Sequence, residues 1–176
     1  MTNDHPGPPV GVNHIAYQTL DLKATHQFYT KVLGCRLAGA LRSPGIRSTS
    51  GEESGPFLHV FYETENGECL AFFALEGSYE RRDDGLPSFT RHLALGVKDA
   101  ADLERWQQEL STQGVEVSPA IDHDGIWQSI YVWDPNGIRL ELTFQNRPLG
   151  PADAAEGAVE LENWLTEHSG TAQLSH

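Results

Sequence analysis

The sequence predicts an α+β fold in which two paired βαβββ modules form a curved mixed sheet around a metal site. The first observation is a repeat, because residues 12–21 (VNHIAYQTLD) and 90–99 (TRHLALGVKD) share a histidine, an alanine two places later and an aspartate seven places later. The second is that each repeat alternates like a strand, becomes helical at its aspartate, and is followed by three more strand patterns. We therefore expect a first module at 11–77, a second module at 89–146, and a C-terminal tail at 147–176.

The first module should begin with the strand of the repeat and continue into a helix at 22–33. Asp21 is a favourable N-cap for this helix, and Gly34 is a favourable residue for its end. Three strands separated by turn residues should follow, at 35–42, 57–64 and 69–75. The segment 43–56 is rich in Ser, Gly and Pro, and we interpret it either as a surface excursion or as a mobile loop near a site.

The second module repeats this order. Its helix is expected at 100–113, between Asp99 and Gly114. Its later strands are expected at 115–121, 128–133 and 138–144. In the tail, 154–167 has the pattern of a short amphipathic helix, which would either cap the sheet, join a partner subunit or fray.

Composition and charge restrict the class of protein. A chain of 176 residues that is 39% hydrophobic is expected to be an ordinary soluble globular protein. With 25 acidic and 12 basic residues its net charge is -13, which disfavours nucleic acid and anionic membrane surfaces as partners. We expect a cytoplasmic location, because the chain has only two cysteines, Cys35 and Cys69, and its N-terminus lacks the apolar run of a signal peptide.

Three side chains are candidate metal ligands. Alternation along 138–144 places Glu141 on the polar side of its strand, opposite Leu140 and Leu142. By the same alternation, His14 and His92 leave the apolar faces of their strands. If the polar faces of the two modules pair, two imidazoles and one carboxylate converge in a 2-His-1-carboxylate site.

This ligand set favours iron. Two neutral nitrogen donors and one anion leave open positions on Fe(II) for a bidentate substrate and O2. Mn(II) or another divalent metal is an alternative, and zinc suits oxidative chemistry less well. Alignment of the two copies through Gly67 and Gly137 places Ala71 where the second copy has Glu141, so only the second module supplies the acid.

At this point the sequence resembles the vicinal oxygen chelate superfamily, which includes glyoxalases, bleomycin resistance proteins and extradiol dioxygenases. The two histidine-bearing strands and the helix end FYTKVLG at 28–34 carry the resemblance, which covers about 12–144. More specifically, IDHDGIWQSIYVWDPNGIRLE at 121–141 is similar in order and spacing to the signature of type I extradiol ring-cleavage dioxygenases.

The resemblance implies a role for each matching residue. His14, His92 and Glu141 would bind the metal, His123 would act as an acid-base group, and Tyr131 would donate a hydrogen bond to a substrate oxygen. A catechol must lose protons to chelate a metal, and histidine suits such proton transfer near neutral pH. The implied protein is an Fe(II)-dependent enzyme of aromatic compound catabolism, with a small catechol-like substrate and O2 as its partners. By analogy with short members, it would be a homodimer, with the modules pairing within one chain or between two.

Two departures keep other functions open. The dioxygenases usually carry another histidine on the fourth strand of the first module, whereas 70–75 (LAFFAL) has none, and His59 on the preceding strand is the candidate substitute. Ala71 stands where lactoylglutathione lyases and methylmalonyl-CoA epimerases usually place an acidic fourth ligand. The alternatives are therefore a metal-dependent isomerase or epimerase, a thiol transferase of the fosfomycin-resistance kind, or a metal-free binder of aromatic ligands of the bleomycin-resistance kind.

Overall fold

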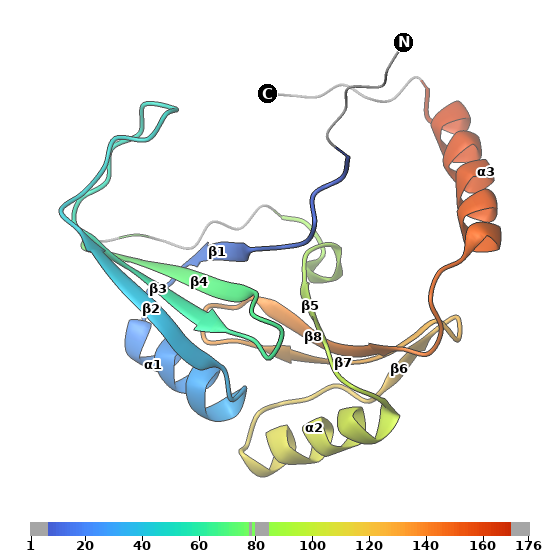
Figure 1. Cartoon of the computed structure of the whole chain (residues 1–176), viewed down its shortest axis with the longest axis horizontal. Coiled ribbons are helices and arrows are strands. Elements are labelled where there is room, and N and C mark those ends of the chain that lie inside the picture. Colours follow the sequence, from blue (N-terminus) through green and yellow to red (C-terminus); the bar gives the residue numbers. More distant parts are fainter. Residues whose placement is uncertain (1–6, 78, 80–84, 170–176) are drawn as a thin grey trace.

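A computed structural model describes residues 7–77, 79 and 85–169, and it confirms the α+β class with two four-stranded mixed sheets (Figure 1). The first module contains β1 (His14–Gln18), α1 (Leu22–Gln27), the π-helical turn η1 (Phe28–Val32), β2 (Arg36–Ser43), β3 (Phe57–Glu63) and β4 (Cys69–Leu75). The second contains the short 3-10 helix η2 (Ser88–Thr90), β5 (Leu93–Gly96), α2 (Ala100–Thr112), β6 (Ile121–His123), β7 (Trp127–Trp133) and β8 (Arg139–Gln145). The helix α3 (Pro151–Glu167) follows.

The two sheets have the same topology. Their strand orders are β1-β4-β3-β2 and β5-β8-β7-β6, and in each sheet only the first strand runs parallel to its neighbour. The histidine-bearing repeats therefore form or precede the edge strands β1 and β5. The sequence repeat is thus a repeat of structure, with the last strand of each module beside its first.

The aspartates of the repeat act as helix caps, as predicted. The Asp21 carboxylate accepts a hydrogen bond from the amide of Ala24 at 2.9 Å, and Asp99 accepts one from Asp102 at 2.8 Å. The helix expected at 22–33 ends in the wider turn η1, where the Leu33 amide donates to the Phe28 carbonyl.

One predicted strand is wrong. The pattern at 115–121 predicts a strand, but the strand β6 covers only Ile121–His123. Ser118 contacts β7 twice, since its amide donates to the Tyr131 carbonyl at 3.0 Å and its hydroxyl accepts from the Tyr131 amide at 2.9 Å. Pro119 then follows, and because proline has no amide hydrogen the ladder does not continue.

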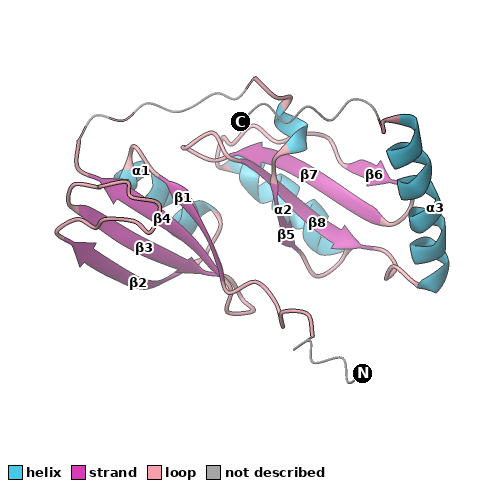
Figure 2. Cartoon of the chain, turned by 90° about the horizontal axis from the view of Figure 1, so that it is seen from above, coloured by secondary structure: helices cyan, strands magenta, loops and turns pink. Residues whose placement is uncertain are grey.

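Each sheet buries one face and leaves the other open. Figure 1 shows α1 and α2 on the same, lower side of the sheets, where apolar strand residues such as Phe72 and Leu140 are fully buried. The opposite, open faces carry the alternate residues, which include the histidines and Glu141. Figure 2 shows the two sheets side by side, so each open face belongs to a different sheet.

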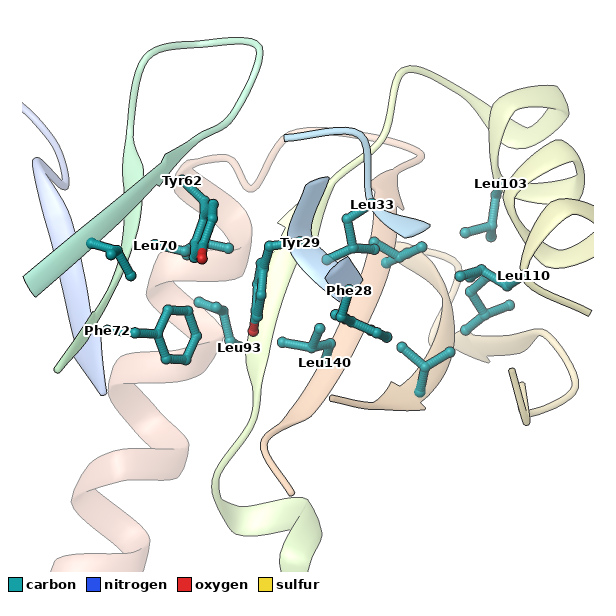
Figure 3. Close-up of a cluster of buried hydrophobic side chains, with 14 residues drawn as sticks. Phe28, Tyr29, Leu33, Tyr62, Leu70, Phe72, Leu93, Leu103, Leu110 and Leu140 are labelled. Atoms are coloured by element: carbon teal, nitrogen blue, oxygen red, sulfur yellow. The ribbon is translucent and has the colours of Figure 1, made fainter. Parts of the chain in front are cut away.

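The two modules share one core. Tyr29 stacks on Tyr62 of the first sheet with ring centroids 5.4 Å apart, and its hydroxyl donates to Asp134 of the second module at 3.0 Å. Figure 3 shows Tyr29 between side chains of the first sheet and Leu140 of the second, with Phe28 beside Leu140. An ion pair between Lys98 and Glu65 at 3.1 Å adds a surface contact.

The helix expected in the tail is present and longer than predicted, but it does not cover a sheet. None of the residues of α3 is buried, and Figure 1 shows the helix standing apart from the strands. Within the described part of the chain, no helix has both the length and the apolar character needed to cross a membrane.

Candidate metal centre

Glu141 lies at the centre of the open face of the second sheet. In β8 it pairs with Ala94 of β5 on one side and with Tyr131 of β7 on the other. Leu140 and Leu142 point into the core, so the alternation of the strand turns Glu141 to the open face, as predicted. Neighbouring side chains nevertheless leave Glu141 only 7% exposed.

His92, the residue immediately before β5, faces this carboxylate. Its Nε2 lies 2.8 Å from Oε2 of Glu141, and its Nδ1 lies 3.1 Å from the carbonyl oxygen of Phe89. Because a carbonyl only accepts hydrogen bonds, Nδ1 carries the proton, and in the neutral ring the lone pair of Nε2 faces the carboxylate. A divalent cation held between these two donors satisfies both, so the pair fits a metal site.

Ser129 holds the carboxylate in place. It is fully buried, and its hydroxyl donates to Oε1 of Glu141. The hydroxyl of Thr143 lies 2.8 Å from the same Ser129 oxygen. Oε1 of Glu141 is therefore held by Ser129, and Oε2 is the oxygen that faces His92.

His123 and Tyr131 form a pair beside Glu141. The Tyr131 hydroxyl lies 3.0 Å from Nε2 of His123, and the guanidinium of Arg139 sits 4.2 Å from the centre of the Tyr131 ring. Burial, and then the negative charge of Glu141, raise the pKa of Tyr131 above its usual value. The phenol therefore keeps its proton at neutral pH and remains a hydrogen-bond donor.

The first module carries a second polar patch, around His14. His14 Nδ1 lies 2.8 Å from the side-chain oxygen of Asn13, and its ring meets that of His59 edge-on at 6.4 Å. His59 faces the same open side, because it pairs with Phe73 of β4. Ala71, the counterpart of Glu141, is fully buried between neighbouring strands and has no donor atom in its side chain.

His59 has the only buried side-chain nitrogen or oxygen without a hydrogen-bond partner among the described residues, its Nε2. Burial, and then the proximity of His14, lower the pKa of the His59 imidazole, which favours its neutral form. His59, the candidate substitute for the missing first-module histidine, thus faces the same side as His14.

The structure brings four of the five predicted site residues together. His92 contacts Glu141, its ring meets that of Tyr131 edge-on at 6.1 Å, and Tyr131 contacts His123. His14 belongs to the other patch, and among residues 7–77, 79 and 85–169 no three His, Cys, Asp or Glu side chains are placed to hold one ion. One chain thus carries the predicted site residues in two separate groups, on two open faces.

The sequence did not single out Ser129 or Arg139 as site residues. A signal was available in the period of the strands, because Ser129 alternates with Tyr131, and Arg139 alternates with Glu141. Polar residues at such positions are easily taken for ordinary surface. Only the register of β7 with β8 shows that both lie beside the predicted ligands.

The topology defines a class of proteins built from paired βαβββ modules with a histidine at each edge strand. The chain belongs to the Glyoxalase/Bleomycin resistance protein/Dioxygenase superfamily, whose family model matches residues 11–142. Members of this superfamily bind divalent metals, and most are enzymes, dioxygenases and transferases among them.

Curated relatives lie in two branches of that superfamily. An iron-dependent extradiol dioxygenase from Rhodococcus jostii is 23% identical over 93% of this chain, and the match spans about half of that protein (49%). A metallothiol transferase, FosB from Bacillus licheniformis, is 29% identical over 76% of this chain and 74% of its own length. A solved structure of a glyoxylase/bleomycin resistance protein/dioxygenase domain from Frankia sp. EAN1pec shares the fold, with a TM-score of 0.63 at 18% identity over 78% of this chain and 99% of that one.

Proposed function

We propose that the protein is a metal-dependent extradiol-type dioxygenase that cleaves a catecholic ring with O2. The observation that carries the proposal is the hydrogen-bonded pair of Tyr131 and His123 beside Glu141, which a site limited to metal binding does not need. Fe(II) is the metal that best suits the donors His92, Glu141 and His14, and Mn(II) is the first alternative. When bound, the ferrous ion would bring the two catechol oxygens and O2 together.

The residues of the chain would supply proton transfer and orientation. Tyr131 keeps its proton and donates to a substrate oxygen placed near Glu141, which fixes the orientation of the ring. His123 accepts a hydroxyl proton of the catechol, directly or through Tyr131 at 3.0 Å, and returns a proton when the ring opens. The stacked guanidinium of Arg139 holds the Tyr131 ring in place.

We further propose that a second copy of the chain supplies His14. His92 and Glu141 lie at the open face of the second sheet and His14 at that of the first, so a complete ligand set is not gathered within the described residues of one chain. A two-fold dimer that faces the first sheet of one copy with the second sheet of its partner completes two identical sites. It would also cover apolar side chains of the open faces that are now exposed, such as Leu41 and Trp133.

The activity is tested with protein loaded anaerobically with Fe(II) and then given a panel of catechols in air-saturated buffer. We expect catechol-dependent O2 uptake and a yellow ring-opened product. Glu141→Ala should abolish both. His123→Gln should lower kcat by about 100-fold or more while leaving the iron content unchanged. Absence of O2 uptake and of product for every catechol at full iron occupancy would overturn the proposal.

A thiol transferase is the second candidate, favoured by the 29% identity to the metallothiol transferase over three quarters of that protein. Such a reaction uses the metal to polarise a substrate oxygen and requires no O2. Thiol consumption under argon with Mn(II), unchanged in His123→Gln, would select this function. Metal analysis of protein purified without chelators also separates both enzymes from a metal-free binder of the bleomycin-resistance kind, for which binding of an aromatic ligand would survive Glu141→Ala.

A further inference from the structure

The segment between β2 and β3 is an ordered arm. The Ser54 amide donates to the Ile46 carbonyl at 2.9 Å, and the Ser48 amide donates to the Glu52 carbonyl at 2.8 Å. Arg47 and Glu53 face each other across the arm in an isolated β-bridge. We call residues 43–56 the arm.

A cavity of about 370 Å³ lies between the arm and the open face of the first sheet. Its sheet side is apolar, with Phe57, Phe73 and Leu75 among the lining residues. The arm contributes Ile46 together with residues that carry hydroxyl and carboxylate groups, such as Ser48 and Glu53. A pocket of this size with apolar walls and a few polar groups is typical of a site for a small organic group.

The cavity lies further along β1 from His14, a proposed metal ligand. Ala16 and Gln18 line it, and they are the residues two and four places after His14 on the same face of β1. A strand rises about 3.3 Å per residue, so the cavity begins roughly 7 Å along β1 from the proposed ligand. A substrate held at His14 would therefore lie next to the Ala16 end of the cavity.

His59 stands at this boundary. Its ring stacks on Phe73, a wall of the cavity, with centroids 3.7 Å apart, and it meets His14 on the other side. Its Nε2 is buried and has no partner among the described atoms. Burying an imidazole nitrogen costs free energy unless the nitrogen is hydrogen-bonded. A polar group of a substrate that extends from His14 into the cavity would supply the missing partner of Nε2.

We propose that the cavity under the arm is a subsite for an apolar aromatic substituent of the substrate, with His59 as the hydrogen-bonding group at its entrance. The proposal rests on the proposed function, which places the reacting ring at His14. It narrows the substrate class to catechols that carry a second, apolar ring. The second ring would lie against Phe57 and Phe73, which already meet edge-on at 5.3 Å.

The test uses two readouts. The first is binding to metal-free protein, measured by fluorine NMR with 4-(4-fluorophenyl)phenol, which has two rings but no vicinal oxygens, and with 4-fluorophenol as the single-ring control. The second is kcat/KM of the Fe(II) enzyme for 4-phenylcatechol and for catechol. The variants are Leu75→Trp, which fills the cavity, and Ile46→Glu, which places a charge on a side chain that is already 54% exposed. Leu37→Trp adds the same bulk on β2 outside the cavity and is the matched control.

We expect the two-ring probe to bind the wild type at least about tenfold more tightly than the one-ring probe. Both cavity variants should remove this difference, and Leu37→Trp should keep it. The kcat/KM for 4-phenylcatechol should fall by about tenfold in the cavity variants, with the value for catechol within about twofold. Equal binding of the two-ring probe to wild type and to Ile46→Glu would overturn the subsite. A changed oligomeric state in Leu75→Trp would also overturn it, because the cavity would then belong to a contact between copies of the chain. Probe binding that depends on the cavity in a protein that turns over no catechol would leave the subsite standing and refute the proposed function.

Discussion

At the scale of single residues, the candidate metal centre depends on groups that never touch the metal. Ser129 is the clearest case, because its buried hydroxyl donates to the Glu141 oxygen that faces away from His92. We predict that Ser129→Ala weakens metal binding by about 10-fold to 100-fold, the usual cost of losing such a supporting hydrogen bond. The measurement is competition with a chromophoric chelator, and Ser111→Ala on the exposed side of α2 is the control. An unchanged metal affinity would show that Glu141 is positioned without Ser129.

Tyr29 makes a second residue-scale prediction, on stability. Its hydroxyl is buried and donates to Asp134, and burial followed by the charge of Asp134 raises the pKa of Tyr29 far above its usual value. The folded state therefore keeps the phenol protonated while the unfolded chain ionises near pH 10, so the free energy of unfolding falls as pH rises above that value. Over the range from pH 8 to pH 11 Tyr29 contributes about 1.4 kcal/mol of this fall.

Tyr29→Phe removes that contribution. Urea unfolding of the variant should lose about 1.4 kcal/mol less than wild type between pH 8 and pH 11, and at pH 8 the variant should be less stable by about 1 kcal/mol for the lost hydrogen bond. Tyr79→Phe, at an exposed position, is the control. A pH-dependent loss in Tyr29→Phe as large as that of wild type would contradict the prediction.

At the scale of elements, the arm depends on close contact between its two limbs. Gly45 has φ of +121°, and a Cβ there would lie 2.5 Å from the Ser54 carbonyl oxygen. Gly45→Ala therefore forces the limbs apart. Gly51→Ala is the matched control, because Gly51 also has a positive φ, +89°, but open space where the Cβ would be added. We predict faster tryptic cleavage at Arg47 in Gly45→Ala than in Gly51→Ala, with the global free energy of unfolding within about 0.5 kcal/mol of wild type in both. Equal cleavage rates would show that the contact does not order the arm.

The elements also show where sequence patterns are sufficient. The alternation and the aspartate caps predict β1, α2, β4 and the open-face position of Glu141, because strand period and capping are local properties of the chain. The strand predicted at 115–121 was wrong because the Ser118 side chain takes the Tyr131 amide of β7 and Pro119 has no amide hydrogen to continue the ladder. The contact of His92 with Glu141 and the cavity under the arm are non-local, since both depend on how separate segments approach in space.

At the scale of the whole molecule, the separation of His14 from His92 and Glu141 makes the proposed dimer testable by complementation. His14→Ala and Glu141→Ala should each be inactive alone. If each site takes His14 from one copy and Glu141 from the other, a mixed dimer has one site with both residues intact and one site with neither.

After subunit exchange by mild denaturation and refolding, an equal mixture should recover about a quarter of the wild-type activity, because half of the dimers are mixed and each mixed dimer has one intact site of two. A mixture of His92→Ala with Glu141→Ala is the matched control and should stay inactive, because both ligands come from the same module and each mixed-dimer site lacks one of them. Mixtures without recovery, in protein shown by sedimentation to have exchanged subunits, would place all three ligands within one chain. Because the two sheets share a continuous core through Tyr29 and Phe28, that outcome would require the modules to separate and pair again in another arrangement.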